Sequence, residues 1–397
     1  MKTEDLVILD KNIKEKISKY EHKRFLFDMI SIQRPFKLIL GLRGVGKTTL
    51  LVQKAIEDKG FYINLDNLAL KSVNLLEILK DIELKFGYSN FFLDEIQSLE
   101  NWELQLKNIF EVSEYNICIS GSSLINILEK SVDLSRRIIT FEIPPLSFRE
   151  YLLFKKNIKI DTITFDDILN NQTRNKKLLE IEKYFNLFNE YLTLGAYPFA
   201  YSKEDSMKVF ENILNKTLYV DFARIKNINE ESLQICLKIL KYISSGSDEI
   251  SFNALSNTLG ISKSKIESLF SLLEKSMLII RIEPKGIGKN LLKIHPKYSM
   301  LLPIRVFVNN LFGYETQIGN LREDMFITSM FFNRNKVFFL KSRNQTPDFY
   351  YDKKVFEIGG KSKTNKQIRG IKEAYIVKDS ISYEENEIAL ILFGCLY

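Results

Sequence analysis

The chain has 397 residues, of which 45% are hydrophobic and 27% are charged, a composition typical of a globular protein with several domains. Its net charge of +7 permits an acidic partner such as DNA without requiring one, and no apolar stretch is long enough to cross a membrane. Acidic residues near the amino terminus argue against an export signal, while three distant cysteines with only two histidines argue against a zinc site and indicate a reducing cytoplasm.

A glycine-rich loop, GLRGVGKTT, follows a predicted strand at residues 36–40 and precedes a predicted amphipathic helix. Its glycines, lysine and threonine fit the pattern GxxxxGK[ST], in which backbone N–H groups and a helix N-terminus hold nucleotide phosphates. The lysine reaches the terminal phosphates, and the threonine hydroxyl is a ligand of Mg²⁺. We therefore predict ATP and Mg²⁺ as cofactors. The predicted ATP-binding residues are Gly41, Arg43, Gly44, Val45, Gly46, Lys47, Thr48 and Thr49.

Two adjacent acids end the apolar strand in NFFLDEIQ, and one further predicted strand, FYINL at residues 61–65, lies between the loop and this motif. A parallel strand places such acids at the carboxyl edge of its sheet, near the bound phosphates. Asp94 is therefore predicted to hold Mg²⁺ together with Thr48. Glu95 is predicted to polarise the water that attacks the γ-phosphate.

Three more polar residues are candidates for the reaction. The strand NICIS ends at Ser120, whose hydroxyl is a candidate for contact with the γ-phosphate or the attacking water, with helix capping as the alternative. Arg136 and Arg137 precede the predicted fifth strand, RIITFEI, where an arginine could reach the γ-phosphate of a neighbouring copy. Ordinary surface ion pairing is the alternative for both arginines.

With these motifs and the stretches FFLDEIQSLENWE and PPLSFREYL, the chain resembles bacterial and archaeal AAA-type ATPases in which a P-loop core precedes a winged helix and a restriction-endonuclease-like domain. Arg43, Gln97 and Trp102 also match the motifs of that family. The resemblance implies an α/β fold with a five-stranded parallel core sheet, in which the strands before Asp94 and Ser120 lie beside the P-loop strand. It also implies ATP binding and, in most members, hydrolysis.

The remaining residues predict three further parts of the chain. Residues 155–177 are rich in Asn and Lys and predict a loosely ordered connection or lid, after which helices form a bridge. The predicted division is a P-loop AAA-type core at 1–154, a polar connection and helical bridge at 155–228, a winged helix-turn-helix at 229–306, and a small α/β restriction-endonuclease-like domain at 307–397.

One predicted short helix ends at a turn at Gly260, and the next begins at Ser262. This is the spacing of a helix-turn-helix. Residues 281–305 follow with six basic residues and one acid, which predicts a basic two-stranded wing. This charge fits contact with DNA phosphates, but winged helices also bind proteins, and both uses stay open. The candidate DNA contacts are Lys263, Lys265, Lys285, Lys289 and Lys293.

Three acids near the carboxyl terminus resemble those of a nuclease site from which one residue is missing. Glu323 lies in a predicted helix, Asp348 begins the strand DFYY, and Glu357 lies in the strand VFEI. Metal-dependent phosphodiesterases of the restriction type combine such carboxylates with a lysine two residues after the second acid. Here that position is Gly359, and Lys361 is the nearest substitute. The sequence therefore favours an inactive fold used for binding over an active nuclease.

The leading hypothesis is a cytoplasmic AAA-type ATPase whose nucleotide state repositions a winged helix on double-stranded DNA. The first alternative is a nucleotide-dependent switch with little turnover that acts through contacts with another protein. The second alternative, an ATP-gated nuclease, ranks last because of the missing lysine. The candidate partners are therefore ATP, double-stranded DNA, a second copy of the chain and another protein, and no membrane is expected among them.

Overall fold

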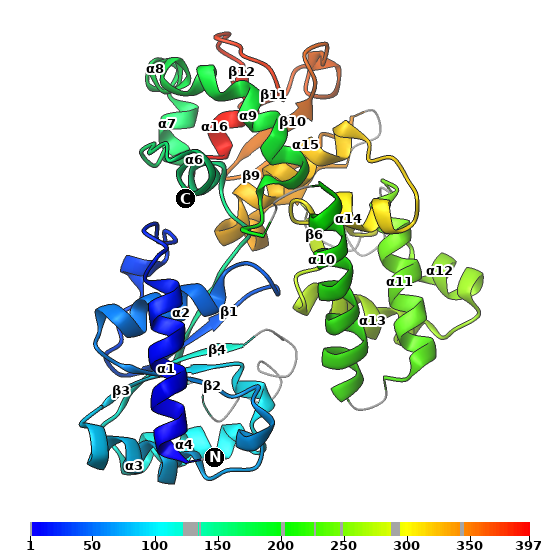
Figure 1. Cartoon of the computed structure of the whole chain (residues 1–397). Coiled ribbons are helices and arrows are strands. Elements are labelled where there is room, and N and C mark those ends of the chain that lie inside the picture. The colour runs from blue at the N-terminus through cyan, green and yellow to red at the C-terminus, as the bar shows by residue number, and fades with distance from the viewer. Residues whose placement is uncertain are drawn as a thin grey trace. The chain divides into compact units, whose positions relative to one another are not determined.

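The computed structural model describes residues 2–121, 134, 136–199, 203–225, 228–246, 249–286, 294–341 and 345–397. The chain divides into two compact units, Met1–Pro144 and Pro145–Tyr397, each with its own β-sheet (Figure 1). Within the described ranges, no helix combines the length and the apolar character that a membrane crossing needs. The predicted α/β fold, with a parallel core sheet and a further α/β sheet toward the carboxyl terminus, is confirmed.

The sheet of the first unit has five strands in the order β2-β3-β4-β1-β5, and all its pairings are parallel. All residues of the interior strand β1 are buried, as expected for a parallel sheet covered on both faces. Because the strands are parallel, the loops that follow them lie at one edge of the sheet. The strands are β1 (Phe36–Leu40), β2 (Phe61–Asn64), β3 (Asn90–Asp94), β4 (Asn116–Gly121) and β5 (Ile138–Glu142).

The position of β3 differs from the prediction. β4, which contains Ser120, pairs directly with β1 as expected. β3, which ends at Asp94, pairs with β2 and β4 and is not beside β1. The prediction that both strands neighbour the P-loop strand was therefore wrong for β3. A fully buried parallel strand is apolar on both faces, so its sequence does not specify its neighbours.

Four helices are described around this sheet. In α1, the Asp10 carboxylate accepts a hydrogen bond of 2.9 Å from the backbone N–H of Tyr62. Lys14 of the same helix donates a bond of 2.6 Å to the backbone oxygen of Gly60. Both bonds hold α1 against the start of β2. The helices are α1 (Thr3–Ile17), α2 (Lys47–Glu57), α3 (Leu75–Phe86) and α4 (Trp102–Val112).

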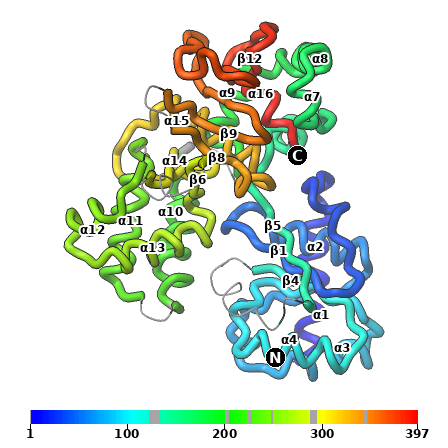
Figure 2. Tube along the Cα trace, turned by 180° about the vertical axis from the view of Figure 1, so that it is seen from behind, coloured from blue at the N-terminus to red at the C-terminus, as the bar shows by residue number. Residues whose placement is uncertain are grey.

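The sheet of the second unit has seven strands in the order β12-β11-β10-β9-β8-β6-β7. β6 forms an antiparallel pair with β7 and a parallel pair with β8, so the hairpin predicted as a wing is continuous with the carboxyl-terminal sheet (Figure 2). The predicted four-part division of the chain stays a prediction. The strands are β6 (Ile280–Pro284), β7 (Lys297–Ser299), β8 (Phe338–Phe339), β9 (Phe349–Tyr351), β10 (Lys354–Gly359), β11 (Ala374–Lys378) and β12 (Glu387–Ala389).

The helices of the second unit include the pair expected from the turn at Gly260. Gly260 ends α12 with a φ of +69°, and the Ser262 hydroxyl accepts a hydrogen bond from the backbone N–H of Lys265 at the start of α13. The helices are α6 (Phe148–Lys156), α7 (Phe165–Leu169), α8 (Asn171–Ile181), α9 (Phe185–Glu190), α10 (Lys203–Asn215), α11 (Glu230–Ser244), α12 (Phe252–Leu259), α13 (Lys263–Lys275), α14 (Ile304–Leu311), α15 (Ile318–Ser329) and α16 (Leu390–Phe393).

Residues 155–177, predicted as a loose connection, contain α7 and most of α8. The side chains of Thr164 and Asn170 cap these two helices. Arg174 is 1% exposed and donates hydrogen bonds to three backbone carbonyl groups, those of Ile168, Glu384 and Glu385. The prediction of loose order was therefore wrong, because a polar composition does not reveal N-caps or an arginine whose terminal N–H groups bond to carbonyls far along the chain.

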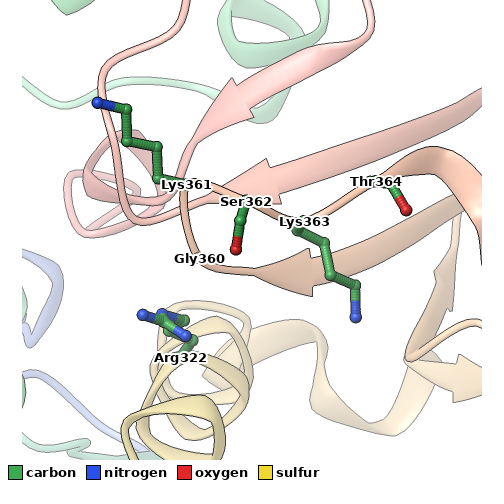
Figure 3. A pocket seen from close by; sticks show the side chains of 6 residues that line it. All are labelled: Arg322, Gly360, Lys361, Ser362, Lys363 and Thr364. Carbon is green, nitrogen blue, oxygen red and sulfur yellow. The ribbon is translucent and has the colours of Figure 1, made fainter.

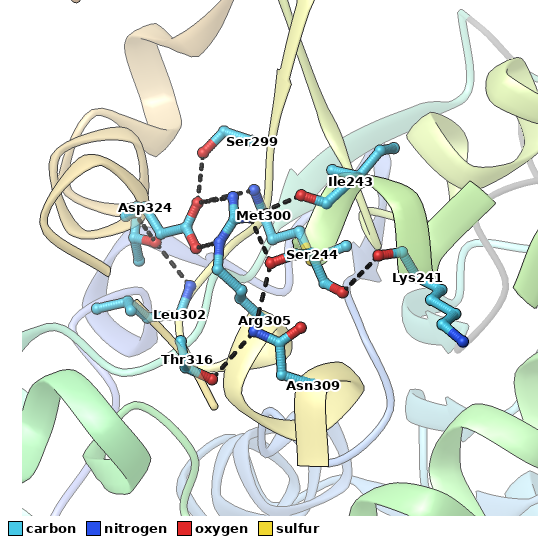
Figure 4. Close-up of polar contacts among 11 residues, drawn as sticks. Lys241, Ile243, Ser244, Ser299, Met300, Leu302, Arg305, Asn309, Thr316 and Asp324 are labelled. Atoms are coloured by element: carbon cyan, nitrogen blue, oxygen red, sulfur yellow. Dashed lines mark hydrogen bonds and ion pairs between the residues drawn. The ribbon is translucent and has the colours of Figure 1, made fainter. Parts of the chain in front are cut away.

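A buried ion pair between Arg305 of α14 and Asp324 of α15 lies in the core of the second unit (Figure 4). Arg305 Nη2 donates to Asp324 Oδ1 at 2.9 Å, and Nη1 donates to the backbone oxygens of Ile243 and Ser244 at the end of α11. The same carboxylate accepts a bond from the Ser299 hydroxyl of β7. The charge of Arg305, counted with the basic wing in the sequence, is therefore neutralised inside the unit.

Replacing Arg305 with Ala leaves the Asp324 carboxylate buried without its partner, so we expect the free energy of unfolding to fall by about 3–5 kcal/mol. Urea unfolding followed by far-UV circular dichroism measures this loss. Trp102, the one tryptophan of the chain, lies in the first unit, so we expect its fluorescence transition to stay in place.

The control is Lys208→Ala, which removes an exposed ion pair with Glu204 on α10 and is expected to leave both transitions unchanged. A circular dichroism transition of R305A that coincides with that of the parent chain would contradict the prediction.

Candidate functional site

The loop between β1 and α2 curves around the amine of Lys47. Gly44 and Gly46 have φ angles of +84° and +97°, which residues with a side chain rarely adopt. Lys47 Nζ donates hydrogen bonds of 2.9 Å to the backbone oxygens of Gly41 and Leu42. The lysine amine therefore lies at the mouth of the loop, beside the N-terminus of α2, where backbone N–H groups can hold phosphates.

The Asp94 carboxylate at the end of β3 is 1% exposed and accepts hydrogen bonds from three hydroxyl groups. Thr48 Oγ1 donates to Oδ2 at 2.7 Å, and the Tyr62 hydroxyl donates to the same oxygen at 2.8 Å. Ser120 Oγ donates to Oδ1. Side chains from α2, β2, β3 and β4 thus converge at the carboxyl edge of the sheet. A carboxylate and a hydroxyl in contact beside a phosphate-binding loop are the oxygen ligands that Mg²⁺ prefers.

Glu95 lies next to this cluster in a left-handed backbone conformation, with a φ of +55°. Its Oε1 lies 3.8 Å from Arg43 Nη1, and Gln97 Nε2 donates a hydrogen bond to its Oε2. The backbone N–H of Glu95 donates to Ser120 Oγ at 3.3 Å. A left-handed conformation is costly for a residue other than glycine, and such conformations cluster at functional sites. These contacts hold the Glu95 carboxylate beside the loop.

Sequence reasoning missed Tyr62 and Arg24. Burial and the charge of Asp94 raise the pKa of Tyr62, so its hydroxyl stays protonated and acts as a hydrogen-bond donor. Arg24 is 5% exposed and donates to the backbone oxygen of Val45 in the loop at 2.6 Å and to that of Pro144 at 2.9 Å. Tyr62 reaches the site through the pairing of β2 with β3, and no local pattern marks either residue.

Of the other catalytic candidates, Ser120 lies at the site and the two arginines do not. Arg137 precedes β5, and its backbone oxygen accepts a hydrogen bond from Phe36 at the start of β1. The length of β1, about 16 Å at the usual rise of a strand, therefore separates this edge from the loop. Arg137 Nη2 also pairs with Glu111 at 2.7 Å. A role of Arg136 or Arg137 toward a neighbouring copy stays a prediction.

The lysines predicted to contact DNA have different surroundings. Lys263 and Lys265 lie in the first turn of α13, where Lys263 is exposed and Lys265 is half-buried. Lys285 is exposed after β6, and its amine lies 4.7 Å and 5.2 Å from the centres of two aromatic rings, those of Phe338 and Tyr350. The other two candidates, Lys289 and Lys293, lie outside the described residues, as do residues 122–133 after Ser120.

The three acids of the predicted nuclease site lie near one another in the second unit. The backbone N–H of Asp348 donates to Glu357 Oε2 at 3.3 Å, and Asp348 Oδ2 accepts from the backbone N–H of Ile358 at 2.7 Å. Burial and the Asp348 charge raise the pKa of Glu323, while burial and the Glu357 charge raise that of Asp348. The three carboxylates therefore share one electrostatic environment.

A lysine that the sequence analysis did not single out lies beside Glu357. Lys363 Nζ is 2.6 Å from Glu357 Oε1. A Cβ atom on Gly359 would come within 2.5 Å of the Lys363 side chain, so a glycine at this position makes room for it. Lys361, the predicted substitute, forms no ion pair with a described carboxylate, and it lines a cavity together with Lys363. Lys363, four residues after position 359, thus places an amine beside Glu357, where the lysine of the motif is missing.

Comparisons with known proteins cover most of the chain. Residues 33–152 match the family model of an AAA domain, and residues 185–301 match a domain of unknown function. Two uncharacterised proteins of Methanocaldococcus jannaschii are similar. MJ1637 is 31% identical over 396 residues, which cover 89% of this chain and 83% of that protein. MJ1544 is 28% identical over 345 residues, which cover 80% and 72%.

Among solved structures, the Walker-type ATPase PABY2304 of Pyrococcus abyssi is similar with 15% identity and a TM-score of 0.39, covering 70% of this chain and 91% of that one. The residues that match the AAA domain include the glycine loop and the two acids Asp94 and Glu95. The structure places these two motifs next to each other. The chain belongs to the family of MJ1637, and its first unit is a P-loop domain of the AAA-type ATPases.

Proposed function

We propose that the first unit binds ATP with Mg²⁺ and hydrolyses it, and that its nucleotide state is coupled to DNA binding by a winged helix made of α11–α13, β6 and β7. The observation that carries the nucleotide part is the 2.7 Å contact between the Thr48 hydroxyl and the Asp94 carboxylate beside the Lys47 amine. The DNA part rests on Lys263, which is exposed, and Lys265, which is half-buried, at the start of α13, the position from which a recognition helix meets phosphates.

Each residue of the site has a separate part in the proposed reaction. Thr48 and Asp94 would hold the metal ion, which when bound neutralises charge on the β- and γ-phosphates. Lys47 offers its amine to the terminal phosphates, and the backbone N–H groups of the loop hold their oxygens. Tyr62 orients the Asp94 carboxylate. Glu95 accepts the proton of the attacking water.

Glu95→Gln keeps the shape of the side chain and removes the proton acceptor, so we expect kcat for ATP to fall by about 10²- to 10⁴-fold. Binding of a fluorescent ATP analogue should persist, whereas Lys47→Ala should abolish it. Steady-state phosphate release and analogue titration measure the two effects. Glu100→Gln, an equal change at an exposed acid of the same unit, is the control. Hydrolysis by E95Q at the parental rate would show that the catalytic assignment is wrong.

Tyr62→Phe removes one hydrogen bond to Asp94 and keeps the ring, so it tests whether Asp94 binds the metal. We expect the Mg²⁺ concentration that gives half-maximal ATPase activity to rise by about 10- to 100-fold, with kcat at saturating Mg²⁺ near the parental value. Tyr88→Phe removes a phenol hydroxyl elsewhere in the unit and is the control. An unchanged Mg²⁺ dependence of Y62F would count against Asp94 as the metal ligand.

Double-stranded DNA should stimulate ATP turnover, with a stimulation that falls steeply as salt rises. Replacing Lys263 and Lys265 together with Gln removes two phosphate contacts, so we expect the slope of log affinity against log salt to become shallower by about two. Turnover and DNA binding are measured over one salt series. Lys238→Gln on α11 removes an exposed charge away from α13 and should change neither quantity.

The alternative of a nucleotide-dependent switch makes the opposite prediction for the same measurement. A switch that acts through protein contacts turns ATP over slowly and is indifferent to DNA at every salt concentration. If DNA leaves the ATP turnover of the parental chain unchanged at every salt concentration, the switch replaces the DNA-coupled function.

Cleavage of DNA by the second unit ranks below both. Lys363 supplies the cation that the sequence lacks at position 359, which makes the charge pattern more complete than expected. However, Glu357 Oε1 is engaged by Lys363, and Asp348 Oδ2 by the backbone N–H of Ile358. Carboxylates that already pair with groups of the same chain are less available to hold a catalytic metal ion. They therefore support a binding surface better than a cleavage site.

A further inference from the structure

A cavity of about 730 Å³ lies in the second unit between α15 and the loop that follows β10 (Figure 3). Arg322 comes from α15, and the other lining residues come from residues 360–364. Three of the lining side chains are cations, and two are hydroxyls. Among the described residues that line the cavity there is no carboxylate. The lining residues are Arg322, Gly360, Lys361, Ser362, Lys363 and Thr364.

Two adjacent glycines make room for two of the cations, Lys363 and Arg322. A Cβ atom on Gly359 would come within 2.5 Å of the Lys363 side chain, and one on Gly360 would come within 3.0 Å of Arg322 Nη2. The backbone N–H of Lys363 donates to the oxygen of Gly360 at 2.9 Å, and this turn reverses the chain. The glycine pair therefore lets an arginine and a lysine lie against the backbone on either side of the turn.

Carboxylates behind the cavity hold two of the three cations in place. Arg322 Nε donates to Asp379 Oδ2 at 2.5 Å, and Lys363 pairs with Glu357. The first contact uses only Nε, which leaves the terminal N–H groups of Arg322 for a ligand. Lys361 is exposed, and no described carboxylate forms an ion pair with it. Asp348 and Glu323 also lie close enough to Lys363 to raise its pKa. Lys361 is therefore the cation of this lining whose charge no described carboxylate pairs with.

We propose that this cavity binds phosphate groups of a nucleic-acid backbone. The planar fork of an arginine matches two phosphate oxygens, and lysine amines and hydroxyl groups supply further donors. The volume exceeds the needs of one inorganic phosphate and matches a ligand of nucleotide size or larger. The proposal depends neither on ATP hydrolysis by the first unit nor on cleavage by the neighbouring acids.

The test is the affinity of the whole chain for a short fluorescein-labelled single-stranded DNA, measured by fluorescence anisotropy in EDTA without ATP. Lys361→Gln should weaken binding by about 3- to 10-fold and lower the salt slope by about one. Lys372→Gln removes an exposed lysine of the same unit that does not line the cavity, and it should leave both values unchanged. An affinity and a salt slope of K361Q equal to those of the parent would overturn the proposal.

A second parent chain distinguishes DNA binding at this cavity from DNA binding at the proposed winged helix. In a chain that already carries K263Q and K265Q, Lys361→Gln should cause the same fold-loss as in the parental chain, whether or not the winged helix binds DNA. Calorimetry with inorganic phosphate at matched ionic strength is the other arm. Phosphate binding that K361Q abolishes, together with unchanged DNA affinity, would assign the cavity to the free anion and overturn the assignment to nucleic acid.

Discussion

The buried carboxylate of Asp94 is the constraint around which the first unit is arranged. An ionised group without water needs several hydrogen-bond donors, and here the donors come from three other elements: α2, β2 and β4. The strand order satisfies this need, because β3 lies between the strands that carry Tyr62 and Ser120. The same arrangement brings the Thr48 hydroxyl into contact with the carboxylate. The stability of this edge of the sheet and the proposed metal site therefore depend on the same hydrogen bonds.

The parts of the site that are local in sequence were the ones that could be predicted. A glycine loop after an apolar strand, and two acids at the end of another, are patterns within a few residues, and the structure places both at one edge of the parallel sheet. Tyr62 and Arg24 contact Asp94 and the loop only through tertiary packing. Their sequence neighbours look like those of any strand or loop, so the pattern contained no sign of their positions.

The second unit shows why charge and polarity in a sequence are weak guides to position. Arg305 adds to the basic count of its segment but lies buried against Asp324. Residues 155–177 look like a linker, yet they form capped helices with a buried arginine. Lys363 reaches Glu357 because glycine at 359 leaves space for its side chain. In each case a distant partner decides where the polar group lies, and sequence spacing cannot identify that partner.

The double pairing of β6 has a mechanical consequence. The strand is bonded to β7 on one side and to β8 on the other, so the hairpin is not a separate lever. A slip of one residue would turn every side chain of β6 to the opposite face, and its alternating buried and exposed residues oppose such a slip. The hairpin is therefore linked through β8 and β9 to β10, the strand that contains Glu357. If a ligand at one end of this sheet changed the affinity for a ligand at the other end, thermodynamic linkage would require the reverse effect to have the same factor.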